Sequence, residues 1–102
     1  MNCSTLADTT TIVAAREVLV SMFGDEIVLL NLRDGVYYGL EDVGARVWML
    51  LEQPVTVAAI REALVSEYDV EPERCDRDTR ALLTELAANG LIEIRERAEP
   101  VG

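Results

Sequence analysis

The sequence contains no lysine and no histidine, so its nine basic residues are all arginines. Without histidine, the chain cannot form a Ser-His-Asp catalytic triad or a metal site that uses imidazole. Nineteen acidic residues leave the 102-residue chain with a net charge of −10. This charge disfavours nucleic acid as a partner, because such binding relies on Lys and Arg to neutralise phosphates. A basic or neutral partner is favoured instead.

Cysteine is also scarce, because the chain has only Cys3 and Cys75, far apart and in no CxxC pair. This usage fits a reducing compartment better than a secreted scaffold held by disulfides. The N-terminus lacks the basic and apolar regions of a secretory signal, and no apolar stretch approaches the roughly 20 residues of a membrane span. We therefore expect a cytoplasmic protein that does not bind a membrane.

The usual catalytic and nucleotide-binding motifs, such as GxGxxG, the P-loop and GxSxG, are missing as well. One acidic run resembles a metal cluster: Asp69, Glu71, Glu73, Asp76 and Asp78. It lacks the central glycine of a calcium loop, and acidic residues are favoured at the start of a helix by the helix dipole. We expect no catalytic residue, no metal and no cofactor, and we expect that the protein is not an enzyme.

Apolar residues make up 50% of the chain, which is enough for the core of one domain. The first twelve residues are rich in threonine and show no clear period, so we expect a flexible N-terminal tail over residues 1–12. We expect a second flexible tail over residues 97–102. The folded domain is then predicted over residues 13–96.

The first half of this domain predicts three antiparallel strands. Apolar runs over residues 18–23, 27–32 and 36–40 are separated by two pairs that favour tight turns, Gly24-Asp25 and Asp34-Gly35. Alternate residues of the second strand are apolar, which predicts that one face of the sheet is covered. The residues expected on that covered face are Val28, Leu30 and Leu32.

The second half predicts three helices. A helical period begins near Asp42 and ends before Pro54, Thr56 is placed to cap a second helix, and Pro72 suits the first turn of a third. Gly90 marks the end of the third helix, and residues 91–95 suit a last short strand. The order predicts an α+β, winged-helix-like domain, in which a three-stranded antiparallel sheet is followed by three helices.

Two stretches carry a resemblance to a known family. VLLNLRDGVYYGLEDVGARVWMLLE resembles the strand-turn-strand-helix segment of the PqqD-like family, and DTRALLTELAANGLIEI is similar to the third helix of that family. The pair Tyr37-Tyr38 followed by Gly39-Leu40 most closely resembles the stand-alone leader-binding proteins of lasso-peptide biosynthesis. One departure is Glu41, where the family often has an asparagine before the first helix.

The resemblance implies a recognition element for ribosomally synthesised, modified peptides. Such a domain binds the leader segment of a precursor peptide by β-strand addition, and it presents the precursor to a leader peptidase and a cyclase. Carried over to this sequence, the resemblance places the peptide between the third strand and the third helix. The implied peptide-binding residues are Val36, Tyr37, Tyr38, Gly39, Cys75, Asp78, Thr79, Leu82 and Leu86.

The sequence also leaves two alternatives to this function open. A winged-helix DNA-binding regulator shares the architecture, but the acidic charge opposes it, and the hairpin comes before the helices instead of forming a wing after them. A structural subunit of a larger enzyme is a further alternative. Within the implied site, Leu82 and Leu86 are expected on the peptide side of the third helix and Leu83 on the core side.

Overall fold

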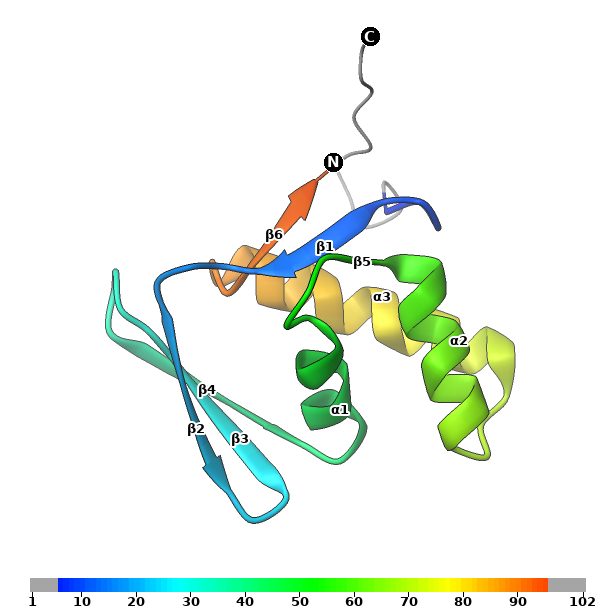
Figure 1. Ribbon diagram of the computed structural model, residues 1–102, viewed down its shortest axis with the longest axis horizontal. Helices are drawn as coiled ribbons and strands as arrows, with labels where there is room; N and C mark the ends of the chain where they lie inside the picture. The colour runs from blue at the N-terminus through cyan, green and yellow to red at the C-terminus, as the bar shows by residue number, and fades with distance from the viewer. Residues whose placement is uncertain (1–5, 96–102) are drawn as a thin grey trace, which may run out of the picture.

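The structure, a computed structural model, describes residues 6–95 of the chain. It contains two three-stranded antiparallel sheets and three helices, which confirms the predicted α+β, winged-helix-like class (Figure 1). None of the described helices is long and apolar enough to cross a membrane. The elements follow one another as β1 (Thr11–Ala14), β2 (Val18–Phe23), β3 (Glu26–Asn31), β4 (Val36–Glu41), α1 (Val43–Leu50), β5 (Val55–Thr56), α2 (Val57–Glu67), α3 (Pro72–Ala88) and β6 (Ile92–Arg95).

The predicted meander is the sheet β2-β3-β4, in which β2 and β4 are the two edges. Both predicted turns are present, and Gly24 and Gly35 take the left-handed backbone conformation (φ 63° and 74°) that such turns require. Asp34 Oδ1 also accepts a hydrogen bond from the Val36 N–H at 3.1 Å. Local turn chemistry therefore determines where each strand of this sheet begins and ends.

The covered face of this sheet is the opposite of the one expected. Ile27, Leu29 and Asn31 are buried, whereas Val28 and Leu30 are half-buried and Leu32 is exposed. The expectation failed because β3 is apolar on both faces, so alternation along the strand does not distinguish them. The inner face of the sheet, which packs on the core, is therefore the Leu29 face, and the outer face is the Leu30 face.

A second sheet, β5-β1-β6, was only partly predicted. The last strand, β6, is confirmed, but its central partner β1 begins at Thr11, inside the expected N-terminal tail. Ile12 is fully buried between β5 and β6, and Leu6 is buried as well. Residues 6–12 are thus part of the fold rather than a tail. Residues 1–5 and the predicted tail over 97–102 lie outside the described residues.

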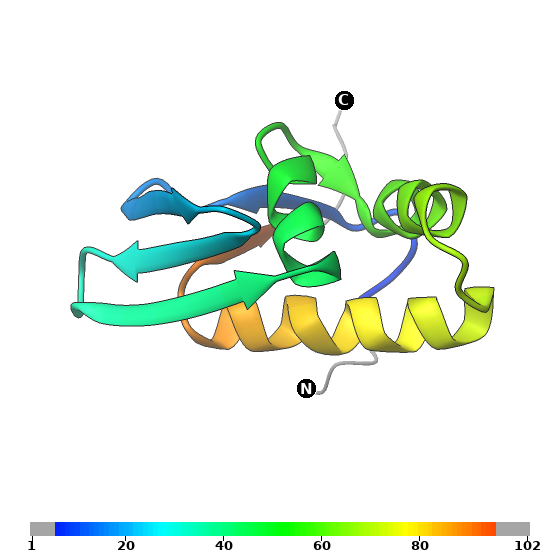
Figure 2. The same ribbon diagram turned by 90° about the horizontal axis from the view of Figure 1, so that it is seen from below.

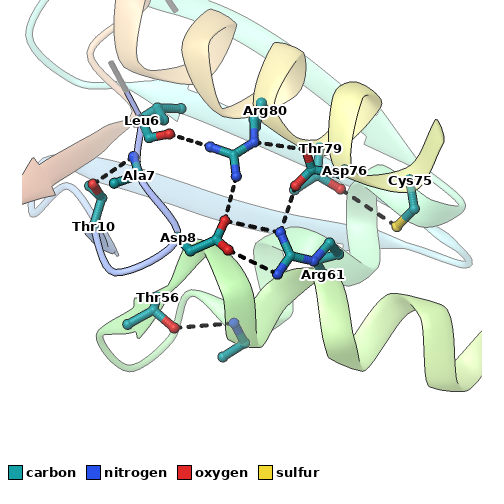
Figure 3. A network of polar contacts seen from close by, with 11 residues as sticks. Leu6, Ala7, Asp8, Thr10, Thr56, Arg61, Cys75, Asp76, Thr79 and Arg80 are labelled. Carbon is teal, nitrogen blue, oxygen red and sulfur yellow. Dashed lines mark hydrogen bonds and ion pairs between the residues drawn. The ribbon is translucent and has the colours of Figure 1, made fainter. Parts of the chain in front are cut away.

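Ion pairs hold the N-terminal segment against the helices (Figure 3). Arg61 of α2 contacts Asp8 at 3.0 Å and Asp76 of α3 at 2.7 Å. Arg80 of α3 contacts Asp76 at 2.9 Å, and it also donates hydrogen bonds to Asp8 and to the Leu6 carbonyl. Two arginines and two aspartates therefore join three segments that lie far apart in the sequence.

The helices begin and end where their capping residues predict. The Thr56 hydroxyl accepts a hydrogen bond from the Ala59 N–H at 3.1 Å, Pro72 occupies the first turn of α3, and Gly90 follows α3 with φ 72°. The start of α1 is different, because Asp42 has φ 54° and its side chain makes no capping bond. The chain thus turns from β4 into α1 at Asp42, one residue after the departure from the family pattern at Glu41.

Candidate functional site: an open strand edge beside a cavity

The open edge of β4 is the backbone part of the candidate site. Leu32 N–H donates to the Glu17 carbonyl, so it points toward β2. Because N–H directions alternate along a strand, the N–H groups of Ile27, Leu29 and Asn31 point the other way, toward β4. Their register partners in β4 are Leu40, Tyr38 and Val36. The backbone groups of Tyr37, Gly39 and Glu41 are therefore the ones left on the open edge.

Helix α3 lies beside this edge. In Figure 2, β4 is the strand of the meander nearest to α3, and the chain passes from β4 directly into α1. The inner-face side chain of Tyr38 is half-buried and reaches Glu85 on α3; burial and the Glu85 carboxylate raise the pKa of Tyr38 to about 12. At the far end of α3, Asn31 Nδ2 donates to the Asn89 carbonyl at 2.9 Å, which fixes the sheet to the helix.

Helix α3 presents two apolar stripes with different surroundings. Cys75, Thr79, Leu83 and Leu86 are buried. The expected core position of Leu83 is confirmed, but the placement of Leu86 on the peptide side is wrong, because this side chain has no exposed surface. Leu82 is only half-buried, and with Asp78 and Glu85 it follows the helical period along the side that faces β4. The side of α3 that faces the end of β4 is therefore centred on Leu82.

A cavity of about 430 Å³ opens beside Leu82. Four predicted site residues, Cys75, Asp78, Thr79 and Leu82, line it, and none of the predicted β4 residues does. Residues from α1, from the end of α2, from the following loop and from the first turn of α3 complete the wall: Val43, Gly44, Val47, Leu64, Tyr68, Asp69, Val70, Glu71 and Arg74. The cavity is thus formed where three helices meet.

Gly44 connects the cavity to the strand. A Cβ atom at this position would lie 3.3 Å from Leu40 Cδ2 and 3.9 Å from Leu82 Cδ2. The absence of a side chain therefore allows the start of α1 to lie close to both the end of β4 and α3. A peptide strand added along β4 would reach the cavity at this end.

The site is mainly acidic. Asp69, Glu71 and Asp78 line the cavity together with a single basic residue, Arg74. None of the ion pairs among the described residues involves these three carboxylates or Glu85. Between residues 6 and 95 there is no group of three residues that could hold a metal ion, and Cys75 is a free, buried thiol. The arrangement offers backbone pairing, an apolar cavity and negative charge.

Sequence reasoning missed several residues of this site. Glu85 follows Leu82 by three positions on the same helical side, so the helical period could have identified it. Val43 and Val47 of α1, and Tyr68 directly after α2, carry no local signal that sets them apart from core residues. Only the tertiary contacts between α1, α2 and α3 reveal that these side chains surround a cavity.

Comparison with known proteins agrees with this geometry. Residues 26–92 match the family described as Coenzyme PQQ synthesis protein D (PqqD). The chain belongs to the PqqD family. The match spans β3 through the start of β6, and it therefore includes the β4 edge and all of α3. Among curated proteins, no sequence matches this PqqD-family chain.

Solved structures give the same assignment. The chain is 37% identical to TbiB1 in complex with the TbiA(beta) leader peptide, with a TM-score of 0.76, and the match covers 85% of this chain and 99% of TbiB1. It is 33% identical to a lasso peptide synthetase B1 complexed with the leader peptide, with a TM-score of 0.72 and coverage of 80% and 96%.

A third structure shows the shared fold. It is the PqqD truncation of Methylobacterium extorquens PqqCD, described as a stand-alone RiPP recognition element, where RiPP denotes a ribosomally synthesised and post-translationally modified peptide. Its identity to this chain is 23%, its TM-score is 0.73, and the match covers 91% of this chain and 99% of that chain.

Proposed function

We propose that this protein binds the leader segment of a ribosomally synthesised precursor peptide, by adding the leader as a strand to the open edge of β4. The observation that carries this proposal is the position of that edge beside α3 and its cavity. Backbone pairing alone accepts any extended peptide, so side-chain pockets must supply the specificity. Two relatives more than 30% identical to this chain are themselves complexes with leader peptides, which supports the proposal.

The site is large enough for a useful affinity. Four backbone hydrogen bonds contribute roughly 1 kcal/mol each, and two apolar side chains buried in the cavity contribute roughly 1.5–3 kcal/mol each. Ordering the flexible leader costs several kcal/mol. The balance is roughly 2–8 kcal/mol, which corresponds to a dissociation constant of about 1 μM or weaker. The acidic lining favours a leader that carries Lys or Arg.

The bound leader would then be presented to other proteins. In this proposal the chain is an adaptor without chemistry of its own, which places the precursor before a leader peptidase and then a cyclase in lasso-peptide biosynthesis. The chain's own residues hold and orient the leader through the β4 backbone and the Leu82 side of α3. Cleavage and ring closure belong to the partner enzymes.

Fluorescence polarisation with a labelled leader peptide tests the binding step. Leu82→Glu adds a charge at the mouth of the cavity and is expected to weaken binding at least about 30-fold. Ile94→Glu is the matched control, because it makes the same change at an exposed site on β6, away from the cavity. Wild-type protein that fails to bind, or a folded Leu82→Glu variant that binds normally, would contradict the proposal.

A further inference from the structure

The outer face of the β2-β3-β4 sheet is an apolar surface that the proposed leader site does not use. Register places Leu19, Leu30 and Tyr37 in one row across the three strands, and Phe23, Glu26 and Glu41 in another. Leu19, Phe23 and Tyr37 are 53%, 62% and 68% exposed. Leu32 is exposed beyond the end of β3, Leu30 is half-buried within its row, and Val28 is half-buried between the two rows.

The chain itself does not cover this face. The buried side chains of the sheet, Ile27 and Leu29, are on the opposite face, and that face is where the core lies. In Figure 1 the three strands extend away from the helices and from β5-β1-β6. Phe23, the only phenylalanine of the sequence, is nearly two-thirds exposed at the end of this extension. Exposed aromatic residues grouped with leucines are typical of protein interfaces.

The leader does not cover the face either. A strand added to β4 extends the sheet within its own plane, so it lies beside Tyr37 and leaves the outer face open. A component other than the leader is therefore needed to bury Leu19, Phe23 and Tyr37.

Two carboxylates on this face indicate the charge of that component. Glu26 and Glu41 are directly opposite each other in the register, and both are exposed. Because the Ile27–Leu40 pair next to them exchanges hydrogen bonds, Glu26 and Glu41 form the closer, non-hydrogen-bonded type of pair. Like charges directly opposite on neighbouring strands are destabilising. No ion pair of the described residues neutralises either of them.

The same charges argue against a second copy of this chain as the occupant. Two outer faces packed together would bring four of these carboxylates into one interface, on molecules that each carry a net charge of −10. A partner with an Arg or Lys side chain placed over Glu26 and Glu41 would remove the repulsion between them. The surface therefore fits a different protein, with an apolar centre and a basic side chain at its rim.

We propose that the outer face of β2-β3-β4 docks a folded partner protein through Leu19, Phe23 and Tyr37, and that a basic side chain of the partner binds between Glu26 and Glu41. The inference rests on the proposed function in one respect, because it takes the leader peptidase as this partner. The leader and the peptidase then use different surfaces of one small sheet. The β4 edge holds the leader, and the outer face holds the enzyme.

Biolayer interferometry with the purified leader peptidase of the same pathway tests this assignment on leader-loaded protein. Phe23→Glu is expected to weaken peptidase binding at least about tenfold. The charge reversal Glu26→Arg on the central strand, away from the open edge of β4, is expected to slow peptidase association at low salt by about threefold. Ile94→Glu on the other sheet is the matched control, and leader affinity by fluorescence polarisation is expected to stay within about twofold of wild type in every variant.

The outcomes separate this inference from the proposed function. Normal peptidase binding by Phe23→Glu and by the charge-reversed variant overturns the docking surface, as does wild-type protein that binds leader but no peptidase. Sedimentation that shows a wild-type dimer, converted to monomer by Phe23→Glu, also overturns it in favour of a second copy. Wild-type protein that binds no leader overturns the proposed function itself.

Discussion

The two sheets of this molecule are both three-stranded and antiparallel, but they differ in how much of their surface is used by the fold. In β5-β1-β6, the edge strands have only two and four residues, and Asp8 just before β1 is paired with arginines. In β2-β3-β4, both edge strands have six residues, and none of the outer-face side chains is buried. Short edges limit pairing with other chains, whereas long open edges invite it. The first sheet mainly stabilises the domain, whereas the second packs one face on the core and leaves its other face and its edges available for binding.

The largest expected effect tests the stabilising role of the first sheet. Ile12→Ala removes a fully buried side chain from β1 and is expected to lower the free energy of unfolding by about 2–5 kcal/mol. Leu19→Ala in β2 is the matched change on the exposed sheet, and it is expected to cost less than about 0.5 kcal/mol. Urea denaturation followed by tryptophan fluorescence measures both, since Trp48 is buried in the core. Equal losses would mean that the outer face of β2-β3-β4 contributes to the fold as much as the buried Ile12 does.

The next effect distinguishes the two edges of β2-β3-β4. Tyr37→Pro removes an N–H from the open edge of β4 and is expected to weaken leader binding by about 100-fold, because a buried carbonyl of the leader loses its donor. By the same alternation, Val20→Pro removes an N–H from the open edge of β2, and leader affinity is expected to stay unchanged. Tyr37→Thr retains the N–H and controls for loss of the ring. Leader binding that fails in Val20→Pro instead would move the site to β2.

A smaller effect, on the rate of leader association, is expected from the carboxylates that are in no ion pair within residues 6–95. Asp78 and Glu85 near β4 are in no ion pair of the described residues, so they are free to attract a basic leader. Association with such a leader is expected to slow severalfold between about 20 and 500 mM salt. In the double variant Asp78→Asn with Glu85→Gln, this salt dependence is expected to become shallower. Stopped-flow rates at several salt concentrations measure it, and an identical slope in the variant would assign the steering to charges elsewhere.

The smallest effect concerns the charges paired near β1. Hydrogen bonds from Arg61 and Arg80 hold the pKa of Asp8 below its usual 3.8, and those from Arg80 and Arg61 do the same for Asp76. A carboxylate with a lowered pKa in the folded state stabilises the protein fully above the unfolded value of 3.8, and this contribution is lost as the pH falls through the folded value.

We therefore expect the melting temperature to change little between about pH 7 and 5 on account of these groups, and to fall below about pH 4. The Asp8→Asn variant is expected to have a slightly lower melting temperature than wild type at pH 7. Its melting temperature is also expected to fall less on acidification. Scanning calorimetry from pH 7 to 3 measures both curves. Parallel curves for the variant and wild type would mean that Asp8 does not contribute to the acid sensitivity.

The parts of the fold that depend on local chemistry could be predicted from the sequence. Turns at Gly24 and Gly35, the Thr56 cap and the end of α3 at Gly90 each follow from the residues at the site. The covered face of β3 could not be predicted, because the strand is apolar on both sides. Strand β1 was missed because its partners, β5 and β6, are distant in the sequence, and a short Thr-rich segment carries no period of its own.

The candidate site shows the same division. The family resemblance, and not a local pattern, placed the site at the edge of the third strand and on the third helix, and β4 is an edge strand in the structure. Leu86 was expected on the peptide side because the rotation of the helix was assigned wrongly. Leu82, Leu83 and Leu86 are equally apolar, and each residue turns a helix by about 100°. The cavity itself needs side chains from α1, α2 and α3 together, and no local pattern predicts their meeting.

The bond between Asn31 and Asn89 holds one end of β4 in place. Asn31 is paired with Val36 in the sheet, and its side chain donates to the Asn89 carbonyl at the end of α3. At the other end of β4, the missing side chain of Gly44 lets α1 lie close to Leu40 and Leu82. The strand is thus fixed to the helices at both ends, by a polar bond at one end and by apolar contacts at the other. Its open edge is therefore preformed, and a strand that pairs with it has no rearrangement of β4 to wait for.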